Sequence, residues 1–259
     1  MRTTLLIILI LYAIGSPVFS QPKNYGKPVI RPSAIVKDVM SWLVYERDYM
    51  NWSADYIPLD TSLHLITKKQ FLESLTTGQY LPVRIESDDS SICYQLVKLD
   101  RSVDNEIKMV IKNKSLTEHQ YYNMEGTPLP NFNFICLNDS VYNTNTAKNK
   151  IVVLNCWFIH CAACVAEIPE LNKLVSRYKE RTDILFLALA FDPAKDLKAF
   201  LKKTTFKYQV VADKTDYLMN ELKIAGYPTH LIVNREGKII KVTNNFNEVI
   251  SGLNKEISK

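Results

Sequence analysis

An apolar run that ends in two closely spaced cysteines constrains this chain more than any other feature. Residues 151–157 (Ile-Val-Val-Leu-Asn-Cys-Trp) have the composition of a strand that is buried on both faces. Cys161 and Cys164 follow, and residues 165–178 then show the amphipathic spacing of a helix. The unpaired N–H groups and positive potential at a helix N-terminus favour a thiolate. The stretch therefore predicts a strand-to-helix junction that carries redox chemistry.

A zinc site and a static disulfide are the alternative uses of this cysteine pair. Zinc usually takes four ligands, and no second Cys or His pair stands at a suitable spacing, so neither a metal nor a cofactor is expected. The chain has five cysteines, an odd number, so at least one thiol stays free or pairs elsewhere. Cys156 is predicted to be an inert core thiol. Cys93 and Cys136 could form a structural disulfide, which their Cα separation decides.

Residues 1–20 predict a cleaved secretory signal peptide. Arg2 supplies a short positive start, an apolar stretch covers residues 5–14, and cleavage is expected before Gln21. A retained N-terminal anchor is the alternative, but a membrane-spanning helix needs about 20 apolar residues. The protein is therefore expected in the periplasm or cell envelope, where a disulfide can persist.

The charge distribution argues against nucleic acid as a partner. The formal net charge of +5 is spread along the chain, without a dense block of Lys and Arg. The residues are 47% hydrophobic, which is typical of a globular protein with a sizeable core.

The chain is predicted to divide at Gly126, in a Gly-Thr-Pro-Leu-Pro segment. Residues 21–125 are expected to form a smaller α+β region that packs against the following domain or binds a partner. Its expected elements are a helix over 33–50, a helix opened by a capping box at Thr67-x-x-Gln70, hairpin strands over 80–86 and 92–99, and helices over 104–112 and 116–124, the last capped by Ser115-x-x-Glu118.

Residues 126–259 are expected to form an α/β domain. The predicted elements are a short hairpin over 132–142, buried strands over 151–157 and 184–191, a helix over 161–181, a helix opened by Asp192-Pro193, a short strand over 208–211, a helix from Asp213 to 223, strands over 230–234 and 238–243, and a closing helix from 246. This order predicts a mixed sheet with parallel core strands, an antiparallel hairpin and flanking helices.

From Gly126 onward the sequence resembles the TlpA/ResA type of exported thioredoxin-fold thiol-disulfide oxidoreductase. The matching segments are residues 130–132 (Pro-Asn-Phe), 153–157 (Val-Leu-Asn-Cys-Trp), 161–164 (Cys-Ala-Ala-Cys), 167–171 (Glu-Ile-Pro-Glu-Leu), 226–233 (Gly-Tyr-Pro-Thr-His-Leu-Ile-Val) and 235–239 (Arg-Glu-Gly-Lys-Ile). The resemblance implies a thioredoxin-like fold and disulfide exchange with partner proteins. It also implies a reducing role in cell redox homeostasis, supplied by a membrane electron donor.

The two cysteines and Glu167 form the expected catalytic set, with Asn155 and His160 as modulating residues. Cys161 is expected to attack as the thiolate and Cys164 to resolve the mixed disulfide, so that the pair forms a redox-active disulfide. In the resembled family an acidic residue at the position of Glu167 tunes proton transfer, although an ordinary surface glutamate is the alternative. Asn155 stands where cytoplasmic thioredoxins carry a buried aspartate, which leaves Glu167 as the main acid/base candidate. Asn155 could equally be a satisfied polar residue of a buried strand.

The resemblance further implies a substrate-binding set. The Tyr227-Pro228 peptide is expected to be cis and to lay the backbone of Tyr227 beside Cys161, where a substrate strand can pair with it. Trp157 belongs to the same predicted set. His160 departs from the family, which usually has tryptophan before the first cysteine. Its imidazolium could stabilise the Cys161 thiolate, or it could be an exposed loop side chain.

A second departure lies between the cysteines. Ala162-Ala163 stands where the family often has proline or a charged residue, and this pair sets much of the redox poise. The remaining histidines have no visible partners and are predicted to be structural or surface residues: His64, His119 and His230.

Two other functions stay open. One is a thiol peroxidase on the same fold, which is disfavoured because Ile159 and His160 do not form the Thr-x-x motif that usually precedes the peroxidatic cysteine. The other is a non-enzymatic envelope binding protein whose disulfide is structural. Peroxide consumption tests the first, and insulin reduction tests the second.

Overall fold

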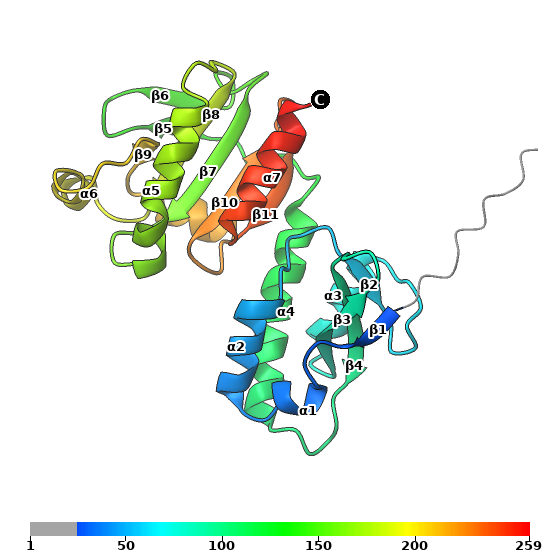
Figure 1. The fold of residues 1–259 in the computed structure, drawn as a ribbon. Coiled ribbons are helices and arrows are strands. Elements are labelled where there is room, and N and C mark those ends of the chain that lie inside the picture. The colour runs from blue at the N-terminus through cyan, green and yellow to red at the C-terminus, as the bar shows by residue number, and fades with distance from the viewer. Residues whose placement is uncertain (1–24) are drawn as a thin grey trace, which may run out of the picture.

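The computed structural model describes residues 25–259 as two main sheets with their own helices, connected by the long helix α4 (Figure 1). The predicted signal peptide, residues 1–20, lies outside the described residues. Within residues 25–259, no helix is both long enough and apolar enough to cross a membrane.

The N-terminal sheet contains four strands in the order β1-β3-β4-β2. Their bounds are β1 Tyr25–Pro28, β2 Ile57–Leu59, β3 Tyr80–Ser87 and β4 Cys93–Lys98. Strands β3 and β4 pair antiparallel as the predicted hairpin, and β2 joins β4 in parallel. Helix α3 (Lys68–Thr76) begins with the predicted capping box, in which Thr67 and Gln70 satisfy each other's backbone N–H groups.

The single helix predicted over residues 33–50 is in fact two helices, α1 (Pro32–Ile35) and α2 (Val39–Tyr49). Asp38 separates them, because its extended backbone starts a new helix and its side chain accepts the Ser41 N–H at 2.7 Å. Aspartate is a favoured residue for this N-terminal cap. The apolar spacing runs through both helices and does not reveal the break.

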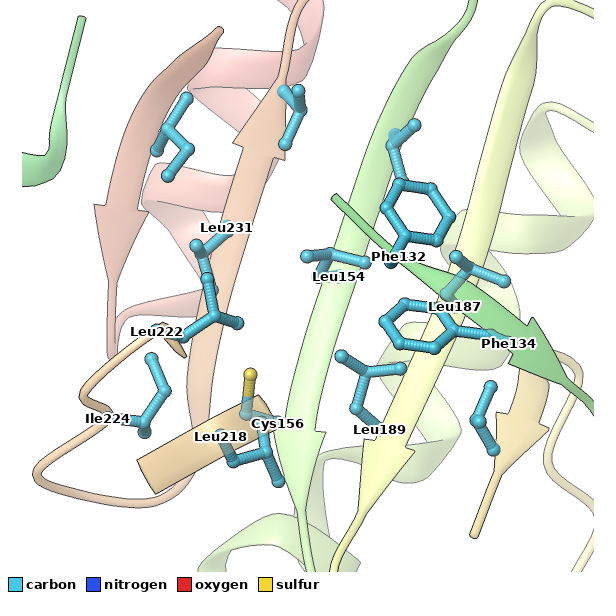
Figure 2. Packing of buried hydrophobic residues seen from close by; sticks show 14 of the residues in the cluster. Phe132, Phe134, Leu154, Cys156, Leu187, Leu189, Leu218, Leu222, Ile224 and Leu231 are labelled. Atoms are coloured by element: carbon cyan, nitrogen blue, oxygen red, sulfur yellow. The ribbon is translucent and has the colours of Figure 1, made fainter. Parts of the chain in front are cut away.

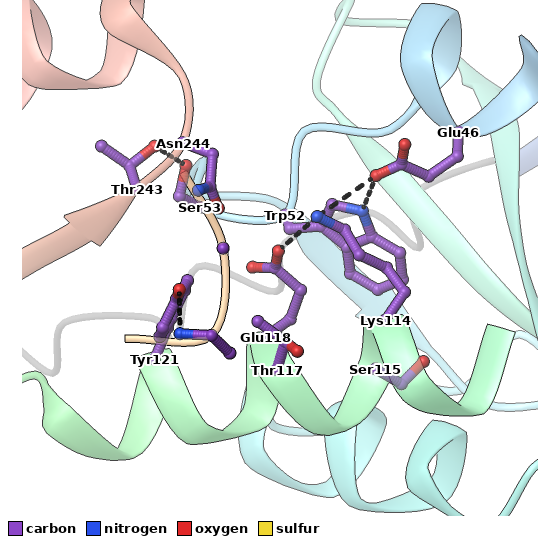
Figure 3. A network of polar contacts seen from close by, with 12 residues as sticks. Glu46, Trp52, Ser53, Lys114, Ser115, Thr117, Glu118, Tyr121, Thr243 and Asn244 are labelled. Atoms are coloured by element: carbon purple, nitrogen blue, oxygen red, sulfur yellow. Dashed lines mark hydrogen bonds and ion pairs between the residues drawn. The ribbon is translucent and has the colours of Figure 1, made fainter. Parts of the chain in front are cut away.

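Helix α4 (Asn105–Met124) is continuous where two helices were predicted. Ser115, the predicted cap, is buried inside the helix and donates its hydroxyl to the Ile111 carbonyl at 2.8 Å. Glu118 pairs with Lys114 one turn earlier, at 2.8 Å, as Figure 3 shows. Both side chains are thus satisfied within the helix, and the predicted capping box at this place was wrong.

The C-terminal sheet contains five strands in the order β11-β10-β7-β8-β9. Their bounds are β7 Ile151–Trp157, β8 Ile184–Ala190, β9 Gln209–Val211, β10 Thr229–Val233 and β11 Ile239–Thr243. Strands β7, β8 and β9 run parallel, and β10 and β11 pair antiparallel to their neighbours. A separate hairpin joins β5 (Asn133–Ile135) and β6 (Val141–Asn143). The predicted mixed α/β sheet is confirmed.

Strand β7 is buried along its whole length and divides two hydrophobic clusters, because successive side chains point to opposite faces. One face receives Val152, Leu154 and Cys156, which pack with side chains of β8, β10 and the β5 hairpin (Figure 2). The other face receives Ile151, Val153 and Trp157. Helices α5 (Ala162–Arg177) and α7 (Phe246–Ile257) cover this second face.

Two further predictions were wrong in detail, and the pairing of Cys93 with Cys136, which the sequence left open, does not occur. Helix α5 ends at Arg177, before the predicted end at 181. The helix predicted from Asp213 to 223 is shorter, over residues 215–221, and consists mostly of the π-helix Tyr217–Glu221. Cys93 and Cys136 are both buried and unpaired. They belong to separate hydrophobic clusters, so no disulfide ties the two sheets together.

Candidate active site

The two cysteines of the Cys-Ala-Ala-Cys segment form a disulfide at the N-terminus of α5, with their Cα atoms 5.2 Å apart. Cys161 is the N-cap residue, and its sulfur accepts the Cys164 N–H at 3.1 Å. Its residue exposure is 8%, against 1% for Cys164. Cys161 is therefore the more exposed of the two cysteines, as expected from the sequence.

The loop before Cys161 is held by a buried carboxylate. Asp192 Oδ2 accepts the backbone N–H of Ile159 at 3.0 Å. The prediction that Asp192 caps the next helix was wrong: Pro193 is the N-cap residue of α6 (Ala194–Leu201), and no side chain bonds to this helix start. Aspartate suits both a helix cap and a loop brace, so the sequence signal is the same for the two roles.

The Tyr227-Pro228 peptide is cis, as the resemblance implies. The Tyr227 ring lies edge-on to Phe158 and to Phe191, with ring centroids 5.5 Å apart in both pairs. Phe158 belongs to the loop before Cys161, so these aromatic contacts pack the cis-proline loop against that loop. Burial raises the pKa of Tyr227 to about 12.

The other side of the cis-proline loop is fixed by three polar residues. Thr229 donates its hydroxyl to the Gly226 carbonyl at 2.7 Å. Asn244 donates its side-chain amide to the Pro228 carbonyl and to the Thr229 hydroxyl. Tyr121 of helix α4 contacts the same hydroxyl at 3.1 Å. The loop is thus held by hydrogen bonds from within itself, from the turn after β11 and from α4.

A polar pair, one side chain buried and the other partly exposed, lies on the α5 side of the sheet. Glu167 follows Cys164 by one helical turn, and its Oε2 lies 3.0 Å from Nε2 of His230. The His230 side chain is completely buried, and that of Glu167 is 24% exposed. The prediction that His230 lacks a partner was therefore wrong, and Glu167 is more than an ordinary surface glutamate.

Asn155 extends this pair across the sheet. It stands directly opposite His230 in the antiparallel β7–β10 pairing, so both side chains lie on one face. Asn155 Oδ1 and His230 Nδ1 are both buried without a hydrogen-bond partner. The only sequence signal for His230 is a histidine inside an otherwise apolar strand, and its contact with Glu167 depends on tertiary packing.

The other predicted site residues occupy different environments. Trp157 is fully buried and packs against Phe200 and Phe206, with centroid distances of 5.7 and 5.2 Å. Its burial favours a packing role over the predicted contact with substrate. His160 is exposed, directly before Cys161. Over residues 25–259, no three or more His, Cys, Asp or Glu side chains gather as a group that could hold a metal ion.

Comparison with known proteins agrees with this geometry. Residues 124–257 match the Redoxin family, and the chain belongs to it. The thiol-disulfide oxidoreductase ResA of Bacillus cereus is 29% identical over 117 residues, which cover 45% of this chain and 67% of the relative. ResA of Bacillus thuringiensis subsp. konkukian is 30% identical with the same coverage. The C-terminal half is therefore a thioredoxin-like thiol-disulfide oxidoreductase of the ResA type.

Solved structures with similar folds include the thioredoxin domain of a thiol-disulfide oxidoreductase from Bacteroides vulgatus. It has a TM-score of 0.46 and 23% identity, and covers 51% of this chain and 96% of its own. A thiol:disulfide interchange protein from Bacteroides sp. has a TM-score of 0.46 and 23% identity, over 52% of this chain and 91% of its own. The strand order of the C-terminal sheet and the family match define the thioredoxin-like fold.

Proposed function

We propose that this protein is an exported reductant of protein disulfides that works through Cys161 and Cys164. The observation that carries the proposal is the arrangement of the disulfide. Cys161 lies at a helix N-terminus and is 8% exposed, Cys164 lies one turn later and is 1% exposed, and a cis-proline loop packs against the segment before them. The same geometry suits attack by the first sulfur and resolution by the second.

The reaction starts from the reduced dithiol. The Cys161 thiolate attacks one sulfur of a partner's disulfide, so the partner's S–S bond breaks, a mixed disulfide forms and the leaving thiolate takes up a proton. Cys164 then loses its proton and attacks the Cys161 sulfur. The mixed disulfide breaks, the partner leaves with its second thiol, and Cys161–Cys164 is oxidised. Two electrons have passed from the enzyme to the partner.

Neighbouring residues assist these steps. The Tyr227 backbone pairs with an extended segment of the partner, as a strand adds to a sheet edge. His160, exposed beside Cys161, stabilises the attacking thiolate when its ring is protonated. Glu167 accepts the proton that Cys164 releases.

Insulin reduction by dithiothreitol tests the activity. The wild type should accelerate the reaction and Cys161→Ser should not. Equal rates for the two proteins would contradict the proposal and favour a binding protein with a structural disulfide. Peroxide consumption, measured in parallel, should stay at the level of the Cys161→Ser variant.

Trapping tests the order of attack and the partners. Cys164→Ala should accumulate mixed disulfides with partner proteins through Cys161, and Cys161→Ala should not. A folded Cys164→Ala protein that traps nothing would contradict this order.

The direction of electron flow and the location require separate measurements. A Cys161–Cys164 reduction potential near that of thioredoxin, about −270 mV, supports a reductant fed by a membrane donor, whereas a potential near −120 mV indicates an oxidant. The mature exported chain should begin at Gln21, which N-terminal sequencing checks.

A further inference from the structure

The buried position of Cys164 creates a problem of proton transfer. Its residue exposure is 1%, and it must become a thiolate before it attacks Cys161. A charge in such an apolar setting is unfavourable unless a nearby group takes the proton and offsets the charge. Glu167 lies one turn further along the same helix face and is the nearest acidic residue in the sequence.

Glu167 does not act in isolation, because its carboxylate contacts His230 at 3.0 Å. The His230 ring is completely shielded from solvent by β10 and the elements packed on it. A carboxylate and an imidazole in contact can together take up one proton, with the charge of the pair changing from −1 to zero. This sharing keeps the added proton inside the protein and next to helix α5.

A second, independent observation concerns the other ring nitrogen. His230 Nδ1 and Asn155 Oδ1 are both buried and without a partner, on residues that stand directly opposite each other. When the ring carries two protons, Nδ1 becomes a donor and the Asn155 carbonyl oxygen is a suitable acceptor. The two unpaired atoms are therefore complementary in the protonated state of His230.

We infer that His230 is a positioning residue for proton transfer at Cys164, holding Glu167 in place and sharing with it the proton that Cys164 gives up. The inference rests on the proposed disulfide exchange and extends it to a residue outside the cysteine motif. In the resolving step, the Cys164 proton passes to the Glu167–His230 pair, and the Cys164 thiolate forms the new S–S bond with Cys161. The electron pair of the broken mixed disulfide leaves on the partner's sulfur.

The other ionisable groups on this face do not compete for the proton. Tyr208 interacts electrostatically with Glu167, and complete burial raises its pKa far above the neutral range, so it stays protonated. Lys241 of β11 and Glu248 of α7 lie 3.9 Å apart and pair with each other. On β11, the residue opposite His230 is Thr243, which is uncharged.

The test separates the two chemical steps with an aromatic disulfide, the Ellman reagent. The reduced protein should release one thionitrobenzoate as Cys161 attacks and a second as Cys164 resolves, which stopped-flow absorbance records as two phases. His230→Gln keeps an N–H donor for Glu167 and removes the titrating ring. The rate of its second phase should fall by at least about tenfold near neutral pH, and the pH dependence of that rate should move to higher pH. The rate of the first phase should stay within about twofold of the wild-type rate.

Matched variants make the result specific. Glu167→Gln should change the second phase in the same way, and His64→Gln, on the N-terminal region, should change neither phase. Unchanged second-phase pH profiles in both His230→Gln and Glu167→Gln would overturn the inference. A reduced wild type that releases no thionitrobenzoate would instead contradict the proposed function itself.

The wild-type protein offers a check that does not depend on the folding of His230→Gln. Imidazole nitrogen shifts, assigned by replacing the other three histidines with Gln, should show a change in His230 protonation between the oxidised and reduced states at one pH. The same protonation in both states over the whole pH range would also overturn the inference.

Discussion

The phenolic oxygen of Tyr121 lies 3.1 Å from the hydroxyl of Thr229, the residue after the cis proline. Because Thr229 gives its own proton to the Gly226 carbonyl, Tyr121 is the donor toward Thr229, and it accepts the Ala225 N–H at 3.2 Å. Tyr121 lies on α4, outside the predicted thioredoxin-like region of residues 126–259. The segment before that region thus contributes directly to the cis-proline loop, which packs against the segment before Cys161.

Tyr121→Phe should destabilise the protein by about 1–3 kcal/mol, because it leaves the Ala225 N–H without its partner in a part-buried site. Urea unfolding measures this change. The rate of insulin reduction should also fall, since the cis-proline loop loses one of its hydrogen-bonded supports.

Tyr122→Phe is the matched control on the same helix. The Tyr122 ring packs against the N-terminal cluster, away from the cis-proline loop. Tyr122→Phe also removes one hydroxyl, but it should leave the rate of insulin reduction unchanged. Equal effects of the two substitutions on that rate would contradict a specific role for Tyr121.

Asp192→Ala should loosen the loop before Cys161, because the Ile159 N–H loses its charged acceptor. The expected loss is about 1.5–3 kcal/mol of stability, typical of a hydrogen bond to a charged group. Asp192→Asn retains a carbonyl acceptor and should lose less than half as much. The rate of Cys161 attack, measured as the first phase with the Ellman reagent, should fall more in Asp192→Ala than in Asp192→Asn. Equal stability and equal rates in the two variants would contradict a role for the Asp192–Ile159 hydrogen bond in holding this loop.

The three cysteines outside the motif should not react in the native protein. All three are buried, and burial raises the pKa of Cys156 and Cys136. After reduction, iodoacetamide should label Cys161 first and leave Cys93, Cys136 and Cys156 unmodified until the protein unfolds. Peptide mass spectrometry checks this, and a Cys93–Cys136 linked peptide from oxidised native protein would contradict the structure.

Asp183 should contribute to stability near neutral pH and lose this contribution in acid. Arg181 holds it with two contacts of 2.7 Å and Arg235 with one of 3.0 Å, and these bonds keep the pKa of Asp183 far below its usual value. Because the folded pKa is depressed, the contribution is complete above the unfolded pKa of about 3.9 and is lost as the pH falls below it.

The size of this effect is limited by solvent. The Asp183 side chain is 35% exposed, so screening holds the contribution to about 1 kcal/mol. Asp183→Asn should therefore be less stable than the wild type at about pH 7 and closer to it at about pH 3. A stability difference that does not change between these two conditions would contradict the assignment.

Local patterns predicted much of this fold. The apolar run over 151–157, the alternation in the β3–β4 hairpin and the spacing of helix α7 each depend on residues that are close in the chain. The cysteine pair and the cis proline also lie in short motifs, so the resemblance implied their geometry correctly.

The missed features depend on contacts between distant segments. His230 contacts Glu167 only because β10 pairs with β7 beneath helix α5. The sequence of either strand alone does not predict this register. Asp192 braces a loop 33 residues earlier, although its local setting suggests a helix cap. Within α4, Ser115 and Glu118 have the spacing of a capping box, but intrahelical bonds satisfy both.

The continuity of α4 fixes how the N-terminal sheet is placed relative to the cis-proline loop. A helix of 20 residues is about 30 Å long and resists bending, and this one packs on α3 near one end and places Tyr121 on the cis-proline loop near the other. Helix α4 thereby joins the N-terminal sheet to the cis-proline loop as one continuous helix instead of a flexible linker. The two sheets are therefore held at one distance and angle by a continuous helix.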